Sequence, residues 1–536
     1  MMMERRARLR PLRRAACFLV LLTVISSVGW GWDRLYGSDD EPVRKLTRLY
    51  RAAAEPFPTA SLPVSRSWLR EAALDLHTAT AVDSSAALAR RVDEYIEALD
   101  YDPSAIRTGV DIAARPEAYL ESSYLREDIT EKLRREAPLL DLGISGGLDG
   151  GPILYTRVLA IRDYRIEEPS NVAPPRSGDP VPYEFNNVYA GYLHVPLRFA
   201  EITFGRQPVE LGPASRSSIV LADDVPFLDA LRITLDLGPI RMHHHVASID
   251  NFEAREDVVL PEPEREVYTF DRNQIYFNTH YFEYRFPAWR LGVGAHTIVS
   301  REMNNFNLSD FFPVFSWHNA NIIPRNMSMF LDATVPLAPG LELYGQLSFD
   351  DIRTTGVGIG DTPTPTIPAA TLGSRYSRFG DGLVWAAGID LGYTHYLWGG
   401  YPAEFGLSRA IYRLRTEGNG FALPLTAPYG PGTVFGIADV GLEAGAVRLS
   451  LLYEIVGRKA GASLFTTAQA ESDELAAQAY DLAHRVEVEA GYRVAAWLSL
   501  SARPGLYVAD GEAEGYLDLG GVVRYDGVRV VERLAE

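Results

Sequence analysis

Apolar and polar residues alternate along most of the chain from Ile153 to Tyr525. Between Leu231 and Leu237, for example, the apolar side chains are separated by Arg232, Thr234 and Asp236. Similar runs begin at Trp289, Leu341 and Val486. Because successive side chains of a strand point to opposite faces, each run predicts a strand with one apolar and one polar face. A soluble β-sandwich and a transmembrane β-barrel both show this pattern, so it leaves the two architectures open.

The order of short and long connectors separates these architectures. The expected short links lie near Ala200, Gly238-Pro239, Pro287-Ala288, Leu337 to Gly340, Gly399 to Pro402, Ala444-Gly445 and Ala495-Ala496. Between them lie long stretches at about residues 165–187, 208–229, 250–273, 300–326, 351–382, 416–432 and 457–483. A barrel inserted from one side of a membrane has short turns on one rim and long loops on the other. We therefore predict an all-β transmembrane barrel.

The number of strands is open at both ends of the barrel. We expect about 16 antiparallel strands from Ile153 to Tyr525, and 18 if two further segments pair. One such segment is Leu139 to Ser145, and the other follows a hairpin-turn signal at Asp526-Gly527. The link at 509–513 is short although it falls in a long-loop position. Aromatic residues next to the short links fit an interfacial girdle on that rim: Phe286, Trp289, Trp398, Tyr401 and Trp497.

Residues 30–136 show a different, helical pattern. The segment VRKLTRLYRAAA is amphipathic, and Asp128 and Glu131 form a capping-box pattern. A further set of apolar residues recurs at helical spacing: Leu88, Val92, Tyr95, Ile96 and Leu99. We therefore expect a small α-helical N-terminal region over residues 30–136, either in the periplasm or plugging the lumen, followed by the barrel over residues 137–536.

The N-terminus has the features of a secretory signal peptide. A basic start, MMMERRARLRPLRR, runs into the apolar segment AACFLVLLTVISSVG, which is short for a membrane span. Cleavage after Gly29 would remove six arginines and one glutamate, which changes the formal net charge from −18 to −23. The single cysteine, Cys17, would also be lost, so the mature chain has no thiolate for a disulfide or metal site. The strong negative charge argues against a nucleic-acid partner.

The segment from Phe204 to Ile233 is the most distinctive in the chain. Gly212-Pro213 interrupts a strand, an extended serine-rich and apolar run follows, and two aspartates precede Pro226. A second notable segment is LYGQLSFDDI, Leu343 to Ile352, in which a strand ends in paired aspartates. Together with a helical region before a large barrel, these segments resemble the Wzi-type capsule assembly family.

That resemblance implies an outer-membrane protein that organises or attaches capsular or other extracellular polysaccharide. Polar and aromatic residues in the long loops, such as 304–312 and 316–326, suit sugar hydroxyls and rings, although water-facing loops have the same composition. In the distinctive segment the candidate polysaccharide-binding residues are Arg206, Gly212, Pro213, Ser217, Ser218, Asp223 and Asp224. The alternative for Gly212-Pro213 is a purely architectural role in a loop that narrows the lumen.

The polar faces of the strands supply candidate lumen-lining residues. They are Arg232, Asp236, Arg241, His243, His245, Arg290, Arg485 and Arg493. Alternation directs His244 to lipid or to the rim. Two histidines at positions i and i+2 can share a metal, yet no carboxylate accompanies them in the sequence, and the acidic loops lack a regular calcium-ligand spacing. We therefore expect a lumen lining and no metal or cofactor.

These observations lead to one main functional hypothesis and one alternative. The main hypothesis is a non-enzymatic barrel in the outer membrane of a Gram-negative-type (diderm) cell, in contact with outer-membrane lipids, that binds polysaccharide through extracellular loops. The alternative is a porin, in which charges of both signs filter small solutes. An enzyme is not expected, because the sequence contains no nucleophile elbow, zinc-protease helix or phosphate loop.

Overall fold

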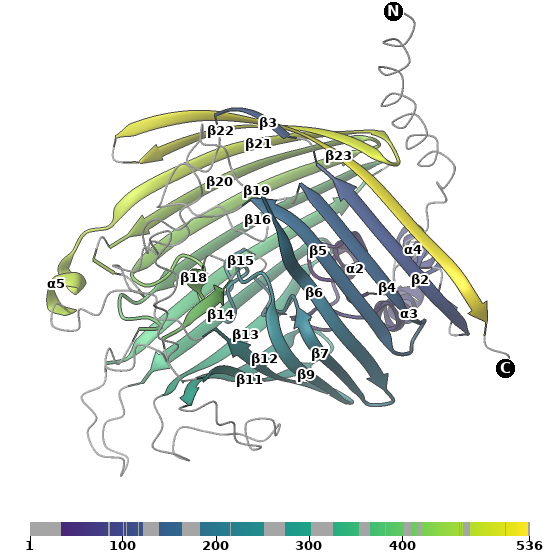
Figure 1. Ribbon diagram of the computed structural model, residues 1–536, viewed down its shortest axis with the longest axis horizontal. Helices are drawn as coiled ribbons and strands as arrows, with labels where there is room; N and C mark the ends of the chain where they lie inside the picture. Colours follow the sequence, from purple (N-terminus) through teal and green to yellow (C-terminus); the bar gives the residue numbers. More distant parts are fainter. Residues whose placement is uncertain are drawn as a thin grey trace, which may run out of the picture.

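A ring of antiparallel strands makes up most of the chain in a computed structural model of the protein (Figure 1). The structure describes residues 34–533 apart from 122–138, 163–182, 251–273, 302–324, 353–364, 401–408, 416–419, 465–471 and the positions 84, 85, 100, 103, 116, 215, 381, 460, 463 and 510. The expected signal peptide, the capping box at Asp128 and nearly all of the loops 304–312 and 316–326 therefore lie outside the described residues.

The ring contains eighteen strands within the described residues. In order they are β2 (Ala105–Ala114), β4 (Leu140–Leu148), β5 (Ile153–Arg162), β6 (Tyr183–Leu197), β7 (Ala200–Gln207), β9 (Leu228–Leu237), β10 (Ile240–Ile249), β11 (Gln274–Arg285), β12 (Arg290–Arg301), β13 (Arg325–Ala338), β14 (Leu341–Asp351), β15 (Ile367–Phe379), β16 (Leu383–Thr394), β19 (Thr433–Ala444), β20 (Val447–Arg458), β21 (Asp481–Ala495), β22 (Leu498–Ala509) and β23 (Glu512–Arg533). Pairing of β2 with β23 closes the ring, and β3 (Glu117–Glu121) continues β2 along β23. The predicted transmembrane barrel fold is confirmed.

The remaining described elements are not strands of the ring. They are the helices α2 (Glu41–Ala52), α3 (Arg66–Asp83), α4 (Ala86–Ala98) and α5 (Ser472–Ala477), and the short strands β1 (Ser61–Leu62), β8 (Glu210–Leu211), β17 (Ile411–Arg415) and β18 (Gly420–Pro424). β1 pairs with β8, and β17 pairs with β18. None of the helices among the described residues is long and apolar enough to cross a membrane.

The strands place apolar side chains outward and polar side chains inward. On β20, Leu449 and Leu451 are exposed, whereas Glu454 on the opposite face is 4% exposed. On β14, Leu343 is exposed while Gln346 and its inward neighbours are buried. A soluble sandwich would bury the leucines and expose the polar face. The observed orientation is the one that a barrel in lipid requires.

The count of eighteen strands agrees with the higher of the two expected numbers, but the first and the last strand differ from the prediction. Two further segments were expected to pair. The first, Leu139 to Ser145, does so as part of β4, which pairs with β2. The hairpin turn expected at Asp526-Gly527 is wrong, because β23 runs straight through these residues and pairs them with β2. β2 itself lies within the segment expected to be helical, so the barrel begins before residue 137. β2 is a strand because it pairs on both edges with distant segments, β4 and β23.

The connectors confirm most of the predicted alternation and correct it around β15, because residues 367–379 of the expected long stretch 351–382 form a strand. Six expected short links separate paired strands, and the short link at 509–513 joins β22 and β23. The link expected at Gly399 to Pro402 is wrong: the turn lies between β15 and β16, near Gly382 with its positive φ of 73°. Residues 395–432 instead form one long connection. Trp398 is therefore no girdle residue but is 1% exposed inside the molecule.

The helices α2, α3 and α4 pack together against the rim that carries the short turns. Val92, Tyr95 and Leu99 are buried in their shared core, as the helical spacing predicts. The Gly340 amide in the β13–β14 turn donates to the Arg51 carbonyl at 2.8 Å. Arg91 donates to the Gly380 carbonyl in the β15–β16 turn at 3.1 Å. The helical region thus contacts the short-turn rim directly.

Candidate functional site

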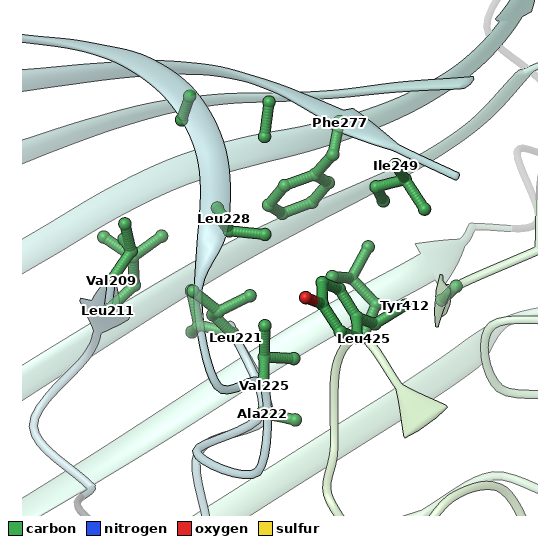
Figure 2. Packing of buried hydrophobic residues seen from close by; sticks show 14 of the residues in the cluster. Val209, Leu211, Leu221, Ala222, Val225, Leu228, Ile249, Phe277, Tyr412 and Leu425 are labelled. Carbon is green, nitrogen blue, oxygen red and sulfur yellow. The ribbon is translucent and has the colours of Figure 1, made fainter. Parts of the chain in front are cut away.

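The connection between β7 and β9 folds inward and forms part of a buried apolar cluster. Its residues Leu211 and Leu221 are each 1% exposed. They belong to the same cluster as Phe277 and Ile249, which come from the barrel strands β11 and β10 (Figure 2). The distinctive sequence segment therefore lies against the inner wall of the barrel.

Polar contacts fix this connection to the wall. The Ile219 amide donates to Gln346 Oε1 at 3.1 Å, and the Thr371 hydroxyl donates to the Ser217 carbonyl at 2.9 Å. Ser218 Oγ donates to the Leu211 carbonyl at 2.9 Å, which closes the loop on itself. Gly212 has a φ of +92°, and an added Cβ there would meet the Gln346 side-chain amide. The backbone at this point accordingly favours glycine.

The long connection between β16 and β19 supplies a second inward-folded segment. It carries the hairpin of β17 and β18, from which Tyr412 and Leu423 enter the same apolar cluster. The Ala222 amide donates to the Leu425 carbonyl at 2.9 Å, which joins the two connections (Figure 2). Trp398 packs on Ile219 in an adjoining cluster.

A third segment comes from the N-terminal region. β1 pairs with β8, with Ser61 opposite Leu211. The Arg232 guanidinium donates to the Pro63 carbonyl at 2.6 Å. We call the three segments, residues 57–65, 208–227 and 409–430, the lumen plug. The described residues of the plug contact the inner side of the barrel through apolar packing and through hydrogen bonds, for example to Arg232 of β9, Gln346 of β14 and Thr371 of β15.

A buried charged cluster connects the plug to the wall. Glu283 accepts hydrogen bonds from the Thr59 hydroxyl at 2.6 Å and from the Ala60 amide. It also lies 2.7 Å from His243 Nε2. Arg290 lies next to it, 3.8 Å from Glu283 and 3.3 Å from Asp332. Because these ionic side chains are almost fully buried, each depends on its partners for stability.

The other expected lumen residues also lie on the inward register. Arg241 pairs with Glu201 and Asp236, at 3.3 Å from each. Arg485 pairs with Glu454 at 3.1 Å, and Arg493 is exposed near the short-turn rim. His245 is buried beside His243, with ring centroids 6.5 Å apart. On the other face His244 stacks on His280 with centroids 4.5 Å apart.

The candidate polysaccharide-binding residues divide into buried and partly exposed sets. Ser217, Ser218 and Asp224 are at most 2% exposed, so they lie within the plug and not on its surface. Gly212, Pro213 and Asp223 are partly exposed. Arg206 pairs with Asp229 at 2.7 Å and lies over the Phe227 ring. The structure therefore does not gather the seven side chains into one surface site.

Several residues that build the plug have no marker in the sequence. In the sequence, Glu283 and Gln346 are ordinary polar residues of two strands. They hold the plug only because the fold brings Thr59 to Glu283 and Ile219 to Gln346. The inward fold of residues 409–430 has one weak signal, the cluster of glycine and proline around Tyr429.

At the edge of this segment, burial and then the Lys459 ammonium lower the pKa of His395. Among the described residues, no cluster of three or more His, Cys, Asp or Glu could hold a metal ion.

The fold defines the chain as a closed transmembrane β-barrel with a plugged inner wall. Among solved structures it is similar to Wzi, an outer-membrane protein involved in group 1 capsule assembly in Escherichia coli and a carbohydrate-binding β-barrel. The match has a TM-score of 0.56 and 13% sequence identity, and it covers 92% of this chain and 99% of Wzi. The similarity supports the barrel fold over nearly the whole length of both chains.

Weaker matches are porins. A BenF-like porin from Pseudomonas fluorescens has a TM-score of 0.39 and 10% identity, and the match covers 79% of this chain and 99% of the porin. OpdR from Pseudomonas aeruginosa has a TM-score of 0.37 and 10% identity, covering 80% of this chain and 98% of OpdR. No model of a known protein family and no curated protein sequence matches the chain.

Proposed function

We propose that this protein is a capsule-assembly barrel of the Wzi type that binds extracellular polysaccharide at its long-loop rim and makes or breaks no bond. The observation that carries the proposal is the lumen plug. Three chain segments share a buried apolar cluster with the inner wall, which is unsuited to solute passage on that side. Wzi, whose fold this chain resembles, is a carbohydrate-binding barrel.

The proposed location is the outer membrane, reached after export directed by residues 1–29. The apolar outer face then contacts lipid, and the short-turn rim with α2, α3 and α4 faces the periplasm. The long connections face outward, where polysaccharide is found. Of the seven candidate residues, Arg206 and Asp223 are partly exposed and would contact sugar, whereas Ser217, Ser218 and Asp224 would shape the plug.

Binding of the protein to polysaccharide from its own strain tests this function. We expect purified full-length protein in detergent to bind that exopolysaccharide in a surface plasmon resonance assay, and a deletion strain to release the polymer into the medium. Many weak contacts along a polymer give such binding high avidity. Absence of binding together with an unchanged cell coat would contradict the proposal.

A porin remains the second candidate, because one part of the wall is not covered by the plug. On β21 to β23, inward side chains such as Glu487, Ser501 and Arg503 are partly exposed. Several of them are paired across strands, for example Arg503 with Asp518 at 2.8 Å. Stable single-channel conductance of the full chain in planar bilayers would favour this second function.

A further inference from the structure

Helix α2 has a basic face directed at the barrel wall. Its apolar residues Val43, Leu46 and Tyr50 are buried against the other helices. On the remaining face, Arg44 and Arg48 lie one helical turn apart. Arg48 forms a two-point ion pair with Glu443 of β19, with nitrogen–oxygen distances of 3.2 and 3.1 Å.

A third arginine lies directly beside this pair. Arg448 of β20 is the register partner of Glu443 across the short turn between β19 and β20. Within the described part of the chain, neither Arg44 nor Arg448 pairs with a carboxylate. Arg448 is exposed and Arg44 is partly exposed.

Positive charge at this place exceeds the negative charge that faces it. Burial, then the Arg448 and Arg48 guanidinium groups, lower the pKa of Arg44 despite the nearby carboxylates of Glu443 and Asp39. Since Glu443 is already engaged by Arg48, two guanidinium groups carry hydrogen-bond donors for a further anion.

The wall next to Arg448 carries small residues. The register leads from Arg448 to Gly491, then to Ser501 and Gly520 on the following strands. An added Cβ at Gly491 would lie 3.7 Å from the Arg448 Cβ, an ordinary van der Waals distance. Small residues thus face the arginines over three neighbouring strands.

We propose that Arg44, Arg48 and Arg448 form an oxyanion-binding site at the short-turn end of the barrel, for a carboxylate or phosphate group. Arg44 and Arg448 donate to the two sides of the anion, and Arg48 is held in place by Glu443. Guanidinium groups match the planar geometry of carboxylate and phosphate oxygens. The site is independent of polysaccharide binding at the opposite, long-loop rim.

Calorimetric titration of the full-length protein in detergent tests this site. One titration uses inorganic phosphate, and the other uses oligogalacturonate, a carboxylated sugar polymer. We expect binding of at least one probe, weakened at high salt, and a loss of affinity of roughly tenfold or more in the double variant Arg44→Gln/Arg448→Gln. Because neither arginine has an ion-pair partner to lose, the variant should fold normally.

Two further variants make the result specific. Arg524→Gln removes another exposed arginine near the short-turn rim and should leave affinity unchanged. Arg448→Lys keeps the charge but not the planar geometry and should recover part of the affinity. The probe that binds identifies the group as phosphate or carboxylate. Failure of the wild-type protein to bind either probe, or equal affinity in the double variant and the Arg524→Gln control, would overturn the proposal.

Discussion

At the scale of single residues, Asp149 joins the helical region to the barrel. It lies in the short turn between β4 and β5 with a fully buried side chain. Its oxygens lie 3.0 Å from Arg66 of α3 and 3.0 Å from Arg107 of β2. They also accept from the Asp102 amide at 2.8 Å. One carboxylate thus fixes a helix, a strand and the linker between them.

Replacement of Asp149 should therefore destabilise the protein strongly. In Asp149→Ala two buried guanidinium groups lose their partner, which we expect to cost roughly 3–5 kcal/mol in the free energy of unfolding. Thermal and denaturant unfolding in detergent, followed by circular dichroism, measures this loss. Asp93→Asn on the exposed face of α4 is the control and should change stability by less than about 0.5 kcal/mol. Similar values for the two variants would contradict the role of Asp149.

Substitution of Gly212 and of Gly238 by alanine distinguishes the energetic cost of backbone strain from the cost of a steric clash. Their φ angles are +92° and +76°, but only Gly212 has a neighbour, Gln346, where a Cβ would lie. Gly238→Ala should cost about 1–2 kcal/mol through strain alone. Gly212→Ala should cost more, because it also displaces the Gln346 amide from Ile219. Equal losses in a denaturant unfolding experiment would mean that the plug adapts to the added methyl group.

At the scale of elements, the N-terminal segment of the plug depends on one carboxylate of the wall. Glu283 holds Thr59 and Ala60 in place. In Glu283→Gln the charge-assisted hydrogen bonds are weakened, so we expect residues 53–65 to detach more often and to be cleaved faster by proteinase K, a protease of broad specificity, with the barrel intact. Glu489→Gln on β21, away from the plug, is the matched control. Unchanged cleavage in Glu283→Gln would show that β1–β8 pairing alone holds the segment.

Helix α5 is held by a lysine from a neighbouring strand end. The Lys459 ammonium donates to the carbonyls of Leu475, Ala476 and Gln478 at 2.8, 2.7 and 3.1 Å. These carbonyls belong to the helix end and to the residues after it, where cations are favourable. Lys459→Met should increase hydrogen exchange over residues 472–480, measured by mass spectrometry. Lys45→Met on α2 should leave that exchange unchanged, and a similar increase in both variants would refute the local effect.

At the scale of the whole molecule, the barrel wall and the plug have separate roles. The wall is stabilised by hydrogen bonds round a closed ring, and the plug by apolar burial and contacts with the wall. Deletion of residues 411–424 should therefore leave a folded barrel and raise its single-channel conductance in planar bilayers above that of the full chain. A folded deletion variant with unchanged conductance would show that this hairpin does not limit passage.

Local pattern determined the barrel. The alternation of side chains, the short links and the helical spacing of Val92, Tyr95 and Leu99 depend on neighbouring residues, so the sequence alone predicted the strands, their topology and the helices. The tertiary structure decided everything that depends on distant contacts. β2 became a strand through pairing with β4 and β23, and Gly399, expected in a short turn, became part of the connection between β16 and β19.

The candidate site followed the same division. The sequence identified Phe204 to Ile233 as distinctive because its glycine, proline and serine composition is local information. Burial of Ser217 and Ser218 depended on Gln346 and Thr371, which lie more than a hundred residues further along the chain. The basic face of α2 likewise became a candidate anion site only because the fold brings Arg448 of β20 close to it. The periodicity of the sequence cannot predict these long-range contacts, because they form only when the ring closes and brings distant segments together.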